Sequence, residues 1–542
     1  MPMKRFLSLA LPLALLALSS TAKPVGYGVK SRHPKAIYRS AGAADDTQSK
    51  ARVGLHSAAP LTSDGSPKVP VILVQFPDLR FTAGLSDGGQ CETDAQCDTV
   101  NATYTLFCNG EGNGSHYTAL GSGGAVTEYF SDQSDTQFTP EFIVIGPVTL
   151  DSSYVYYGKN SSTTTDVNLS KFYSQSLTKA QAIYEGSWDD FDNDGNGSVD
   201  MAFFIFAGEG ENALDPDTDA DAENHIWPSE RGSGGTINSV TYGAYACCNE
   251  LYEGVIDGIG VFVHELSHAL GLPDLYDTGY TLFGLDYWDV MDSGCYCADG
   301  YVPCNYSAYE RDFMGWQSLI TLDPDSAQAL TLSPISSNGD GYKIVNAENE
   351  DEYYVIENRQ NKGWDTYIGH GTSSYKMHGM LVTHIDYNQS RWINNKVNYY
   401  SYSHPGCTIL PADGELFSAM DVTTTSEYYA YLASMQGDPF PGTTALDSLA
   451  GDMATVYTTT GDTPGLMNQP LYNITEQDDL TITLDYLTLS DEEEDEENAI
   501  IALRSDGTTP TAVHTLSGIR VESTTDLPAG IYIVDGKKVL IR

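Results

Sequence analysis

HELSHALGLPD, residues 264–274, is the stretch that decides the fold of this 542-residue chain. His264 and His268 are four residues apart, so on a helix both imidazoles project from one face toward one point. Neutral imidazole is a good zinc ligand, and two such groups supply half of a tetrahedral site. The spacing therefore predicts a zinc-binding helix over residues 256–272.

The residues around the two histidines make the prediction more specific than a bare HExxH, which also occurs on ordinary amphipathic helices. Glu265 stands beside the first ligand, where a carboxylate can take a proton from a metal-activated water. Gly271 allows a sharp backbone turn, and Pro273 prevents the helix from continuing. The turn makes Asp274 the preferred third ligand, and Asp277 is the competing candidate.

A methionine follows the third ligand at a characteristic distance. Residues 287–293 read YWDVMDS, which resembles a Met-turn, and Met291 lies 291 − 274 = 17 residues after Asp274. A lone methionine is usually ordinary core packing. After two histidines and an aspartate in this order, it predicts a methionine that lies beneath a catalytic zinc.

The segment HELSHALGLPDLYD, residues 264–277, resembles the immune inhibitor A family of secreted bacterial metallopeptidases, which are metzincin-like. Its Asp third ligand is similar to that of the snapalysins. The resemblance extends from about residue 69 to residue 485 through signatures in family order, among them YVIENRQ at 354–360, GMLVTHID at 379–386 and DPFPG at 438–442. It implies an endopeptidase that cleaves proteins with zinc and a Glu265 general base, and a prosegment that confers latency.

One position departs from the metzincin pattern. Several metzincins place a tyrosine two residues after the methionine, where it stabilises the oxyanion, whereas this chain has Ser293 there. Tyr301, Tyr306 and Tyr309 lie nearby in the sequence. The sequence does not choose among these three tyrosines.

A second metal-binding pattern lies at residues 190–200, which read DFDNDGNGSVD. Counted from Asp192, side chains that carry oxygen fall at alternating positions, as in the first nine residues of an EF-hand calcium loop; they include Asp192, Asp194, Asn196 and Asp200. The acidic residue expected at position 12 is replaced by Phe203, so another group, such as Asp190, must complete the site. We expect Ca²⁺ here, against the alternative of an Asx-rich solvated turn.

The composition limits the partners and the compartment. The chain has 27 basic and 74 acidic residues and a net charge of −47, which disfavours nucleic acid and anionic lipid. Residues 1–22 have the basic start, apolar run and small residues of a signal peptide, and no later segment is apolar enough to span a bilayer. Nine cysteines fit an oxidising compartment, although their connectivity cannot be deduced. These features predict a secreted or cell-surface protein without a transmembrane anchor.

The length and the changing composition of the chain predict several domains, because 542 residues are too many for one hydrophobic core. We expect an α+β metzincin-like peptidase domain, an all-β sandwich-type domain and a short C-terminal β-hairpin module. The predicted boundaries are 1–22 signal peptide, 23–67 propeptide or linker, 68–320 catalytic domain, 321–487 all-β domain, 488–498 acidic linker and 499–542 C-terminal module. Strands are expected at 69–76 and 201–207, and helices at 170–186 and 307–316.

Both ends of the chain carry functional expectations. Residues 516–542 resemble the sorting domains that the type IX secretion system recognises, with a plain β-hairpin tail as the alternative. The segment before residue 68 contains no cysteine, so a carboxylate of Asp45 or Asp46 is the predicted inhibitory zinc ligand of a zymogen. A flexible tether is the alternative, because the composition also suits disorder.

The function predicted from these features is zinc-dependent hydrolysis of peptide bonds in protein substrates. Two other functions are considered. One is a catalytically silent adhesin whose β-region binds host protein or glycan, and the other is a zinc hydrolase that acts on a non-peptide substrate. Activity on denatured protein with and without a chelator separates all three.

Overall fold

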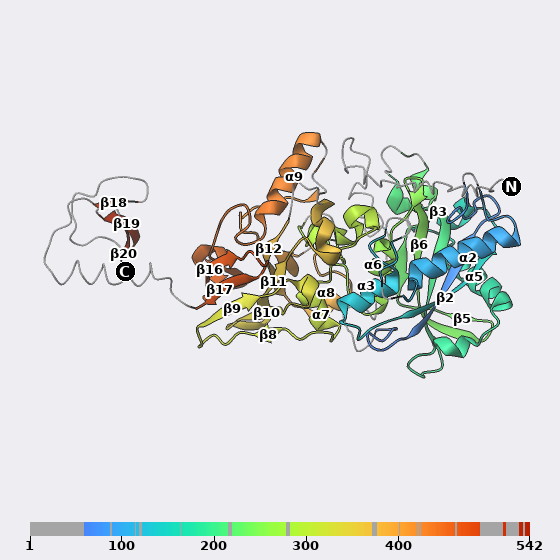
Figure 1. Ribbon diagram of the computed structural model, residues 1–542, viewed down its shortest axis with the longest axis horizontal. Coiled ribbons are helices and arrows are strands. Elements are labelled where there is room, and N and C mark those ends of the chain that lie inside the picture. The colour runs from blue at the N-terminus through green and yellow to red at the C-terminus, as the bar shows by residue number, and fades with distance from the viewer. Residues whose placement is uncertain are drawn as a thin grey trace, which may run out of the picture.

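The structure is a computed structural model of the chain (Figure 1). It describes residues 59–86, 89–113, 115–118, 122–162, 164–214, 219, 221–277, 282–370, 377–399, 402–419, 422, 424–460, 463–487, 513–515, 530–534 and 537–541. The predicted signal peptide, Asp45, Asp46 and the acidic linker lie outside these residues. Within the described part, no helix is both long enough and apolar enough to cross a membrane.

A seven-stranded mixed sheet forms the centre of the predicted catalytic domain, residues 68–320, which is called the catalytic half. Its strands are β1 (Lys68–Gln75), β2 (Glu141–Thr149), β3 (Val199–Glu209), β4 (Ser229–Arg231), β5 (Thr236–Ile237), β6 (Val240–Tyr252) and β7 (Val255–Ile256). The main path runs β2-β1-β3-β6-β4, in which β2, β1, β3 and β6 are parallel neighbours and β4 pairs with β6 antiparallel at the edge. The predicted strands at 69–76 and 201–207 are β1 and β3.

Both faces of this sheet are buried, as expected for parallel strands. Alternate residues of β1 and β3 belong to two separate hydrophobic clusters, with Phe203 in one and Phe204 in the other. The first cluster includes helices α2 (Asp94–Asn109), α3 (Val126–Gln133) and α6 (Gly260–Ala269), and the second includes α4 (Tyr154–Gly158) and α5 (Leu169–Ile183). Figure 1 shows the helices around the central strands.

The helix that carries the histidines is shorter than predicted. Residues 255–256 form strand β7, and α6 begins at Gly260. A Cβ on Gly260 would lie 1.8 Å from the carbonyl oxygen of Cys295, so only glycine allows the helix to start so close to that backbone. Phe262 then stacks on Phe203 of β3 with the ring centroids 3.7 Å apart, and this contact fixes α6 on the sheet.

The second half contains sheets and also helices, so the prediction that residues 321–487 are all-β is wrong. Helices α8 (Gln389–Ile393) and α9 (Thr425–Gly437) lie among its strands, and α9 starts with a capping box formed by Thr424 and Glu427. Figure 1 shows α9 projecting from the body of this half. The capping box at Thr424 was the local signal for this helix, because it marks a helix start within a segment that otherwise has a β-type composition.

The strands of the second half form three sheets. A five-stranded sheet runs β13-β12-β11-β10-β8, a three-stranded sheet runs β16-β17-β9, and β14 pairs with β15. Their bounds are β8 (Ile320–Thr321), β9 (Gln328–Leu332), β10 (Tyr342–Asn346), β11 (Asn349–Arg359), β12 (Gly379–Asp386), β13 (Cys407–Ile409), β14 (Thr455–Thr460), β15 (Thr463–Leu466), β16 (Leu471–Glu476) and β17 (Ile482–Tyr486). One hydrophobic cluster contains residues from all three sheets.

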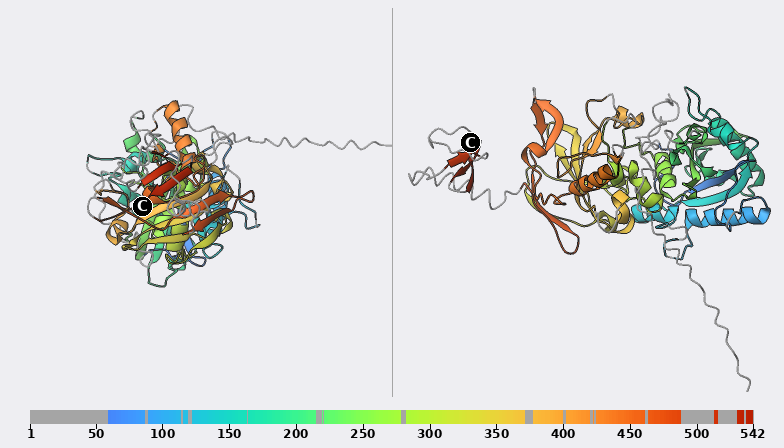
Figure 2. Two further views of the ribbon diagram at one scale, coloured as in Figure 1. Left: turned by 90° about the vertical axis from the view of Figure 1, so that its left-hand side faces the viewer. Right: turned by 90° about the horizontal axis from the view of Figure 1, so that it is seen from above.

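The two halves share side chains across the predicted boundary at residue 320. The cluster that packs on α6 also contains Val355 of β11, Leu381 of β12 and Trp392 of α8. Figure 2 shows the blue-green and the yellow-orange parts side by side along the molecule. Because the core is continuous here, groups from the second half can reach the site on α6.

Several shorter elements complete the described chain. The 3-10 helices include η3 (Trp188–Phe191), η7 (Ser293–Gly300), η8 (Ile335–Ser337) and η9 (Gly363–His370). The predicted helix at 307–316 is α7 (Ala308–Phe313). Near the C-terminus, β18 (Val513–Thr515), β19 (Gly530–Val534) and β20 (Lys537–Ile541) form an antiparallel sheet. A disulfide joins Cys91 and Cys97, and the other seven cysteines are buried thiols that form no disulfide.

Candidate metal centre

Helix α6 directs two imidazoles to one point. The rings of His264 and His268 have centroids 4.9 Å apart and stand almost perpendicular to each other. Nδ1 of His264 hydrogen-bonds the carbonyl oxygen of Val290 at 2.9 Å, and Nδ1 of His268 hydrogen-bonds that of Leu272 at 2.8 Å. Each Nδ1 therefore carries the proton as donor, which leaves the Nε2 lone pairs for a metal.

The turn after α6 brings a carboxylate to the same point. Gly271 has φ +103°, a conformation that favours glycine, and the chain reverses so that Asp274 faces both rings. Asp274 Oδ1 lies 3.3 Å from Nε2 of His264 and 3.2 Å from Nε2 of His268. Apart from these nitrogens, this buried oxygen has no hydrogen-bonding partner among the described residues. The three atoms surround a space suited to a metal ion.

Asp277, the competing third ligand, does not join this group. It is buried, and one of its carboxylate oxygens accepts a hydrogen bond from the backbone N–H of Leu282 at 2.6 Å. The cluster of possible metal ligands contains Asp274 together with the two histidines.

The electrostatics of His264 and Asp274 match their geometry. Burial acts to lower the pKa of His264, but hydrogen bonds with Asp274 and Cys295 outweigh it and hold that pKa well above its usual value. Burial acts to raise the pKa of Asp274, but the charge of His268 and the hydrogen bond from His264 hold it well below its usual value. The pocket therefore stabilises an ionised carboxylate that faces a positive charge. A divalent cation requires the same ionised carboxylate as its ligand.

A residue from the second half fixes the carboxylate. The side-chain oxygen of Asn395, just after α8, accepts the backbone N–H of Asp274 at 2.6 Å, and its side-chain nitrogen donates to Asp274 Oδ2. Asn398 donates to the carbonyl oxygen of Leu275 at 2.7 Å and holds the same turn. Outer hydrogen bonds of this kind orient metal ligands and raise their affinity.

The predicted Met-turn contacts the first histidine and the loop that follows α6. Met291 is fully buried, and its carbonyl oxygen accepts the backbone N–H of Leu275 at 2.9 Å. Its own N–H donates to Asp289 Oδ1 at 2.8 Å, and the preceding carbonyl of Val290 is the partner of His264. This turn therefore positions both the first imidazole and the loop that carries Asp274.

A narrow cavity of about 30 Å³ opens beside the first histidine. Glu265 lines it and is only 7% exposed. The other lining side chains come from distant parts of the chain: Asn212, Trp227, Pro228, Val261, His264, Tyr276, Asp292, Cys295 and Tyr296. A carboxylate next to the proposed ligands in a confined space is well placed to accept a proton.

The three tyrosines considered from the sequence have other partners. Tyr301 donates its hydroxyl to the carbonyl oxygen of Ile256, the Tyr306 hydroxyl hydrogen-bonds Ser267, and the Tyr309 hydroxyl accepts from Trp392. None of the three lines the cavity, and Ser293 is buried against Asp292.

Tyr276 and Tyr296 line the cavity in place of those tyrosines, and sequence reasoning did not select them. Tyr276 lies inside the quoted motif, two residues after Asp274, so its position was a usable signal. Tyr296 could not be found this way, because it lies on η7, outside the motif at residues 264–277. Asn212 and Asn395 gave no local signal at all.

The acidic loop brings three carboxylates together. Asp192, Asp194 and Asp200 each offer an oxygen within 4.8 Å of the others, and Asp190 is not part of the group. Asp192 and Asp194 also accept the backbone N–H of Asn196, and Asp192 accepts that of Gly197. Asp200 lies on β3, where one oxygen accepts from Asn193 at 2.9 Å and the other is buried without a partner.

Residues 57–318 match a protein family described as "Immune inhibitor A peptidase M6, catalytic domain". The chain is 28% identical to "Immune inhibitor A" of Bacillus thuringiensis subsp. alesti over 327 residues, which are 52% of this chain and 46% of the relative. It is 27% identical to "Pre-pro-metalloprotease PrtV" of Vibrio cholerae serotype O1 (strain M66-2) over 279 residues, 46% of this chain and 29% of the relative. The chain thus spans less than half the length of these curated relatives. Residues 57–318 are therefore similar to the catalytic domain of the immune inhibitor A peptidases.

Proposed function

We propose that this chain is a secreted zinc-dependent endopeptidase that hydrolyses peptide bonds in proteins. One observation carries the proposal: two imidazole Nε2 atoms and a buried carboxylate oxygen converge beside Glu265 within a catalytic domain of a peptidase family. The name of one matched relative, a pre-pro-metalloprotease, agrees with this activity.

His264, His268 and Asp274 fit the ligand set of a catalytic zinc. Two nitrogen atoms and one oxygen leave a fourth position for water or substrate, as in other catalytic zinc sites. Zinc held there supplies a Lewis acid that lowers the pKa of water and polarises the scissile carbonyl. Two features support this fit: the imidazoles are oriented by backbone carbonyls, and Asp274 Oδ1 faces both Nε2 atoms.

Glu265 is proposed as the general base and then the general acid. Its carboxylate takes a proton from the attacking water and passes that proton to the nitrogen of the leaving amine. The narrow, largely buried cavity limits competing water around this carboxylate. Met291 supports the site by holding the backbone of the Asp274 loop.

Asn212 is proposed to bind the backbone of the substrate. It is 2% exposed, lines the same cavity as Glu265, and neither its Oδ1 nor its Nδ2 has a partner among the described residues. Leaving such a buried group unpaired costs about 1–3 kcal/mol. A carboxamide offers one acceptor and two donors, which complement the N–H and C=O of a peptide group.

A calcium ion is proposed in the acidic loop, held by Asp192, Asp194, Asn196 and Asp200. The three clustered carboxylates support it, and Ca²⁺ favours oxygen ligands of this kind. Asn196 donates its backbone N–H to two of these carboxylates and its Oδ1 accepts from Ser198, so it lies within the same loop. The ion would tie this loop to β3.

Export, sorting and latency are proposed from the sequence alone. The signal peptide directs secretion, the C-terminal module engages secretion machinery, and Asp45 or Asp46 silences the zymogen. The described fold places one limit on the last step. Leu61 is buried and hydrogen-bonds the carbonyl oxygen of Ala269 on α6, and Trp316 donates to Ser63. The sequence predicts an activating cleavage near residue 68. Because Leu61 and Ser63 contact the catalytic region, we propose instead that the cleavage falls before residue 60, so that these contacts remain.

Fluorescent denatured casein, incubated with the purified chain, tests the proposed function. We expect cleavage to stop after zinc is chelated and to return when zinc is added back. An adhesin would leave casein intact under every condition. A zinc hydrolase of another class would also leave casein intact while it binds zinc at His264 and His268, and zinc analysis of the protein distinguishes these two outcomes.

A further inference from the structure

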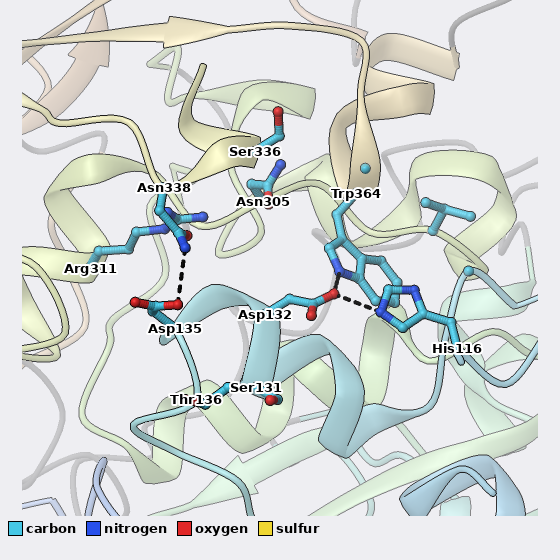
Figure 3. Close-up of a pocket in the computed structure, with 13 residues that line it drawn as sticks. His116, Ser131, Asp132, Asp135, Thr136, Asn305, Arg311, Ser336, Asn338 and Trp364 are labelled. Carbon is cyan, nitrogen blue, oxygen red and sulfur yellow. Dashed lines mark hydrogen bonds and ion pairs between the residues drawn. The ribbon is translucent and has the colours of Figure 1, made fainter. Parts of the chain in front are cut away.

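A second cavity, of about 370 Å³, lies between the catalytic half and the second half (Figure 3). None of its lining residues lines the cavity beside Glu265. Its walls come from α3 and the turn after it, from the segment that leads into α7, and from η8 and η9. The peptidase mechanism proposed above makes no use of it.

The floor of this cavity carries hydrogen-bond donors without partners. Arg311 Nε, Asn305 Nδ2 and Ser336 Oγ are buried and unpaired among the described residues. Arg311 and Asn305 are each only 2% exposed. Each buried unpaired group costs about 1–3 kcal/mol, and a ligand that brings acceptor oxygens would remove this cost. A guanidinium among the donors favours a carboxylate as that acceptor.

One glutamine holds two of these donors in place. Gln133 Oε1 accepts from the Arg311 guanidinium at 3.0 Å, and Gln133 Nε2 donates to Asn305 Oδ1 at 3.0 Å. A second guanidinium nitrogen of Arg311 donates to the carbonyl oxygen of Ile335 at 3.1 Å. The donors are thereby fixed before any ligand arrives, which lowers the entropic cost of binding.

The rim of the cavity carries the opposite charge. Asp135 is exposed and accepts a hydrogen bond from Asn338 at 3.2 Å. Asp132 Oδ2 accepts from Trp364 Nε1 at 2.8 Å and forms an ion pair with His116 at 2.9 Å. Figure 3 shows Asp135 near Arg311 and Asn338 on one side, and Asp132 with Trp364 and His116 on the other. Both carboxylates can accept further hydrogen bonds.

We propose that this cavity binds a small zwitterion, namely a free α-amino acid or a dipeptide. The carboxylate of the ligand meets the donors of Arg311, Asn305 and Ser336 at the floor, and its ammonium group meets Asp135 at the rim. A simple anion suits the site less, because the chain carries a net charge of −47 and the rim is acidic. The volume falls within the usual range for small-molecule sites.

The proposed function supplies a source for the dipeptide form of this ligand, because an endopeptidase releases short peptides. Binding itself does not depend on catalysis. The cavity can therefore be tested on protein that has been stripped of metal, in which an amino acid cannot bind by chelating zinc. A negative result here leaves the peptidase proposal unaffected, and the reverse also holds.

Titration calorimetry on the metal-free full chain provides the test. The probes are alanine and alanyl-alanine, with propionate and propylamine as matched compounds that each retain one charge. We expect the zwitterions to bind with a dissociation constant of about 1 mM or tighter, and each single-charge compound to bind at least about tenfold more weakly. Absence of zwitterion binding at about 10 mM, or propionate binding as tightly as alanine, would overturn the proposal.

Two variants locate the binding. Asp135→Asn should weaken alanine about tenfold and leave propionate unchanged, because it removes only the charge that faces the ammonium group. Ser336→Ala should weaken alanine and propionate alike. Ser337 and Asp325 are exposed and do not line the cavity, so Ser337→Ala and Asp325→Asn serve as matched controls and should change neither. Alanine binding that is unaltered in both Asp135→Asn and Ser336→Ala would place the ligand elsewhere and refute the site.

Discussion

The candidate metal centre and the acidic loop each gather three side chains whose ligand atoms lie within 4.8 Å, yet they are held in different ways. At the metal centre, the ligands are oriented by groups from outside the helix: the carbonyl oxygens of Val290 and Leu272, and the amide of Asn395. In the loop, Asp192 and Asp194 accept backbone N–H groups of the loop itself.

This difference indicates what a metal would do at each place. At the centre, the ligand atoms are buried and fixed by distant segments, so a bound metal acts on a prepared cavity that contains Glu265. In the loop, Asp194 is exposed and only Asp200 belongs to a buried strand, so a bound metal mainly ties the loop to β3. The centre should therefore control activity, and the loop should control stability.

The largest expected effect comes from Glu265→Gln. Removing the general base should lower kcat by about 10²- to 10⁴-fold while zinc binding is preserved, because glutamine keeps the shape of the side chain and cannot accept the proton. Casein cleavage rates together with zinc analysis of the purified variant measure both properties. Glu185→Gln makes the same substitution at an exposed glutamate of the same half, and this variant should cleave casein as the unaltered chain does. Retention of near-normal cleavage by Glu265→Gln would rule out the proposed role.

The next effect comes from Asn395→Ala, which tests whether outside groups prepare the centre. Losing the two hydrogen bonds to Asp274 should weaken zinc affinity by about 10- to 100-fold, as expected for an outer partner of a metal ligand. Competition with a chromogenic chelator measures this affinity. Asn394→Ala removes a neighbouring exposed amide and should leave it unchanged. Equal zinc affinities for both variants would show that Asp274 needs no such support.

The same contrast explains how much of the site could be predicted from the sequence. His264, Glu265, His268 and Asp274 follow one another along a helix and one turn, so their spacing alone indicates their convergence. Asn395 follows Asp274 by 121 residues and reaches it only because the two halves share a core. No local pattern encodes that contact.

The fold shows the same limit. The predicted strands at 69–76 and 201–207 are continuous apolar runs, and both proved to be strands of the parallel sheet. The predicted helix over 256–272 was too long at both ends, because residues 255–256 pair with β6 and the helix starts only where Gly260 can approach Cys295. Pairing and close approach depend on distant segments, which a local apolar pattern cannot represent.

A smaller effect is expected from Asn212→Ala, which concerns the substrate side of the cavity. Losing hydrogen bonds worth about 1 kcal/mol should lower kcat/KM on a peptide by about 5- to 10-fold. The decisive measurement uses a peptide whose amide next to the scissile bond is N-methylated. The unaltered chain should cleave this peptide more slowly than its parent. Asn212→Ala should cleave the methylated peptide and its parent at nearly the same rate.

A purely structural role for Asn212 would lower both rates and keep their ratio. Equilibrium binding of the parent peptide to Glu265→Gln, with and without Asn212→Ala, gives a readout that needs no turnover. Equal binding by the two proteins would contradict the proposed contact.

The smallest effect belongs to the acidic loop. If Ca²⁺ binds the folded state alone, a concentration 100-fold above its dissociation constant stabilises the chain by about 2.7 kcal/mol. In a protein of this size the melting temperature should rise by only a few degrees, and Mg²⁺ at the same concentration should do less, because it loses its water reluctantly. Asp192→Asn should abolish the rise, whereas Asp325→Asn, at an exposed aspartate of the second half, should preserve it.

Casein cleavage at saturating zinc should be the same with and without Ca²⁺ at a temperature well below melting, because the loop does not line the cavity beside Glu265. A melting temperature that does not respond to Ca²⁺ would leave the three carboxylates as an acidic turn, and loss of cleavage without Ca²⁺ would show that the loop and the metal centre are not separate in function.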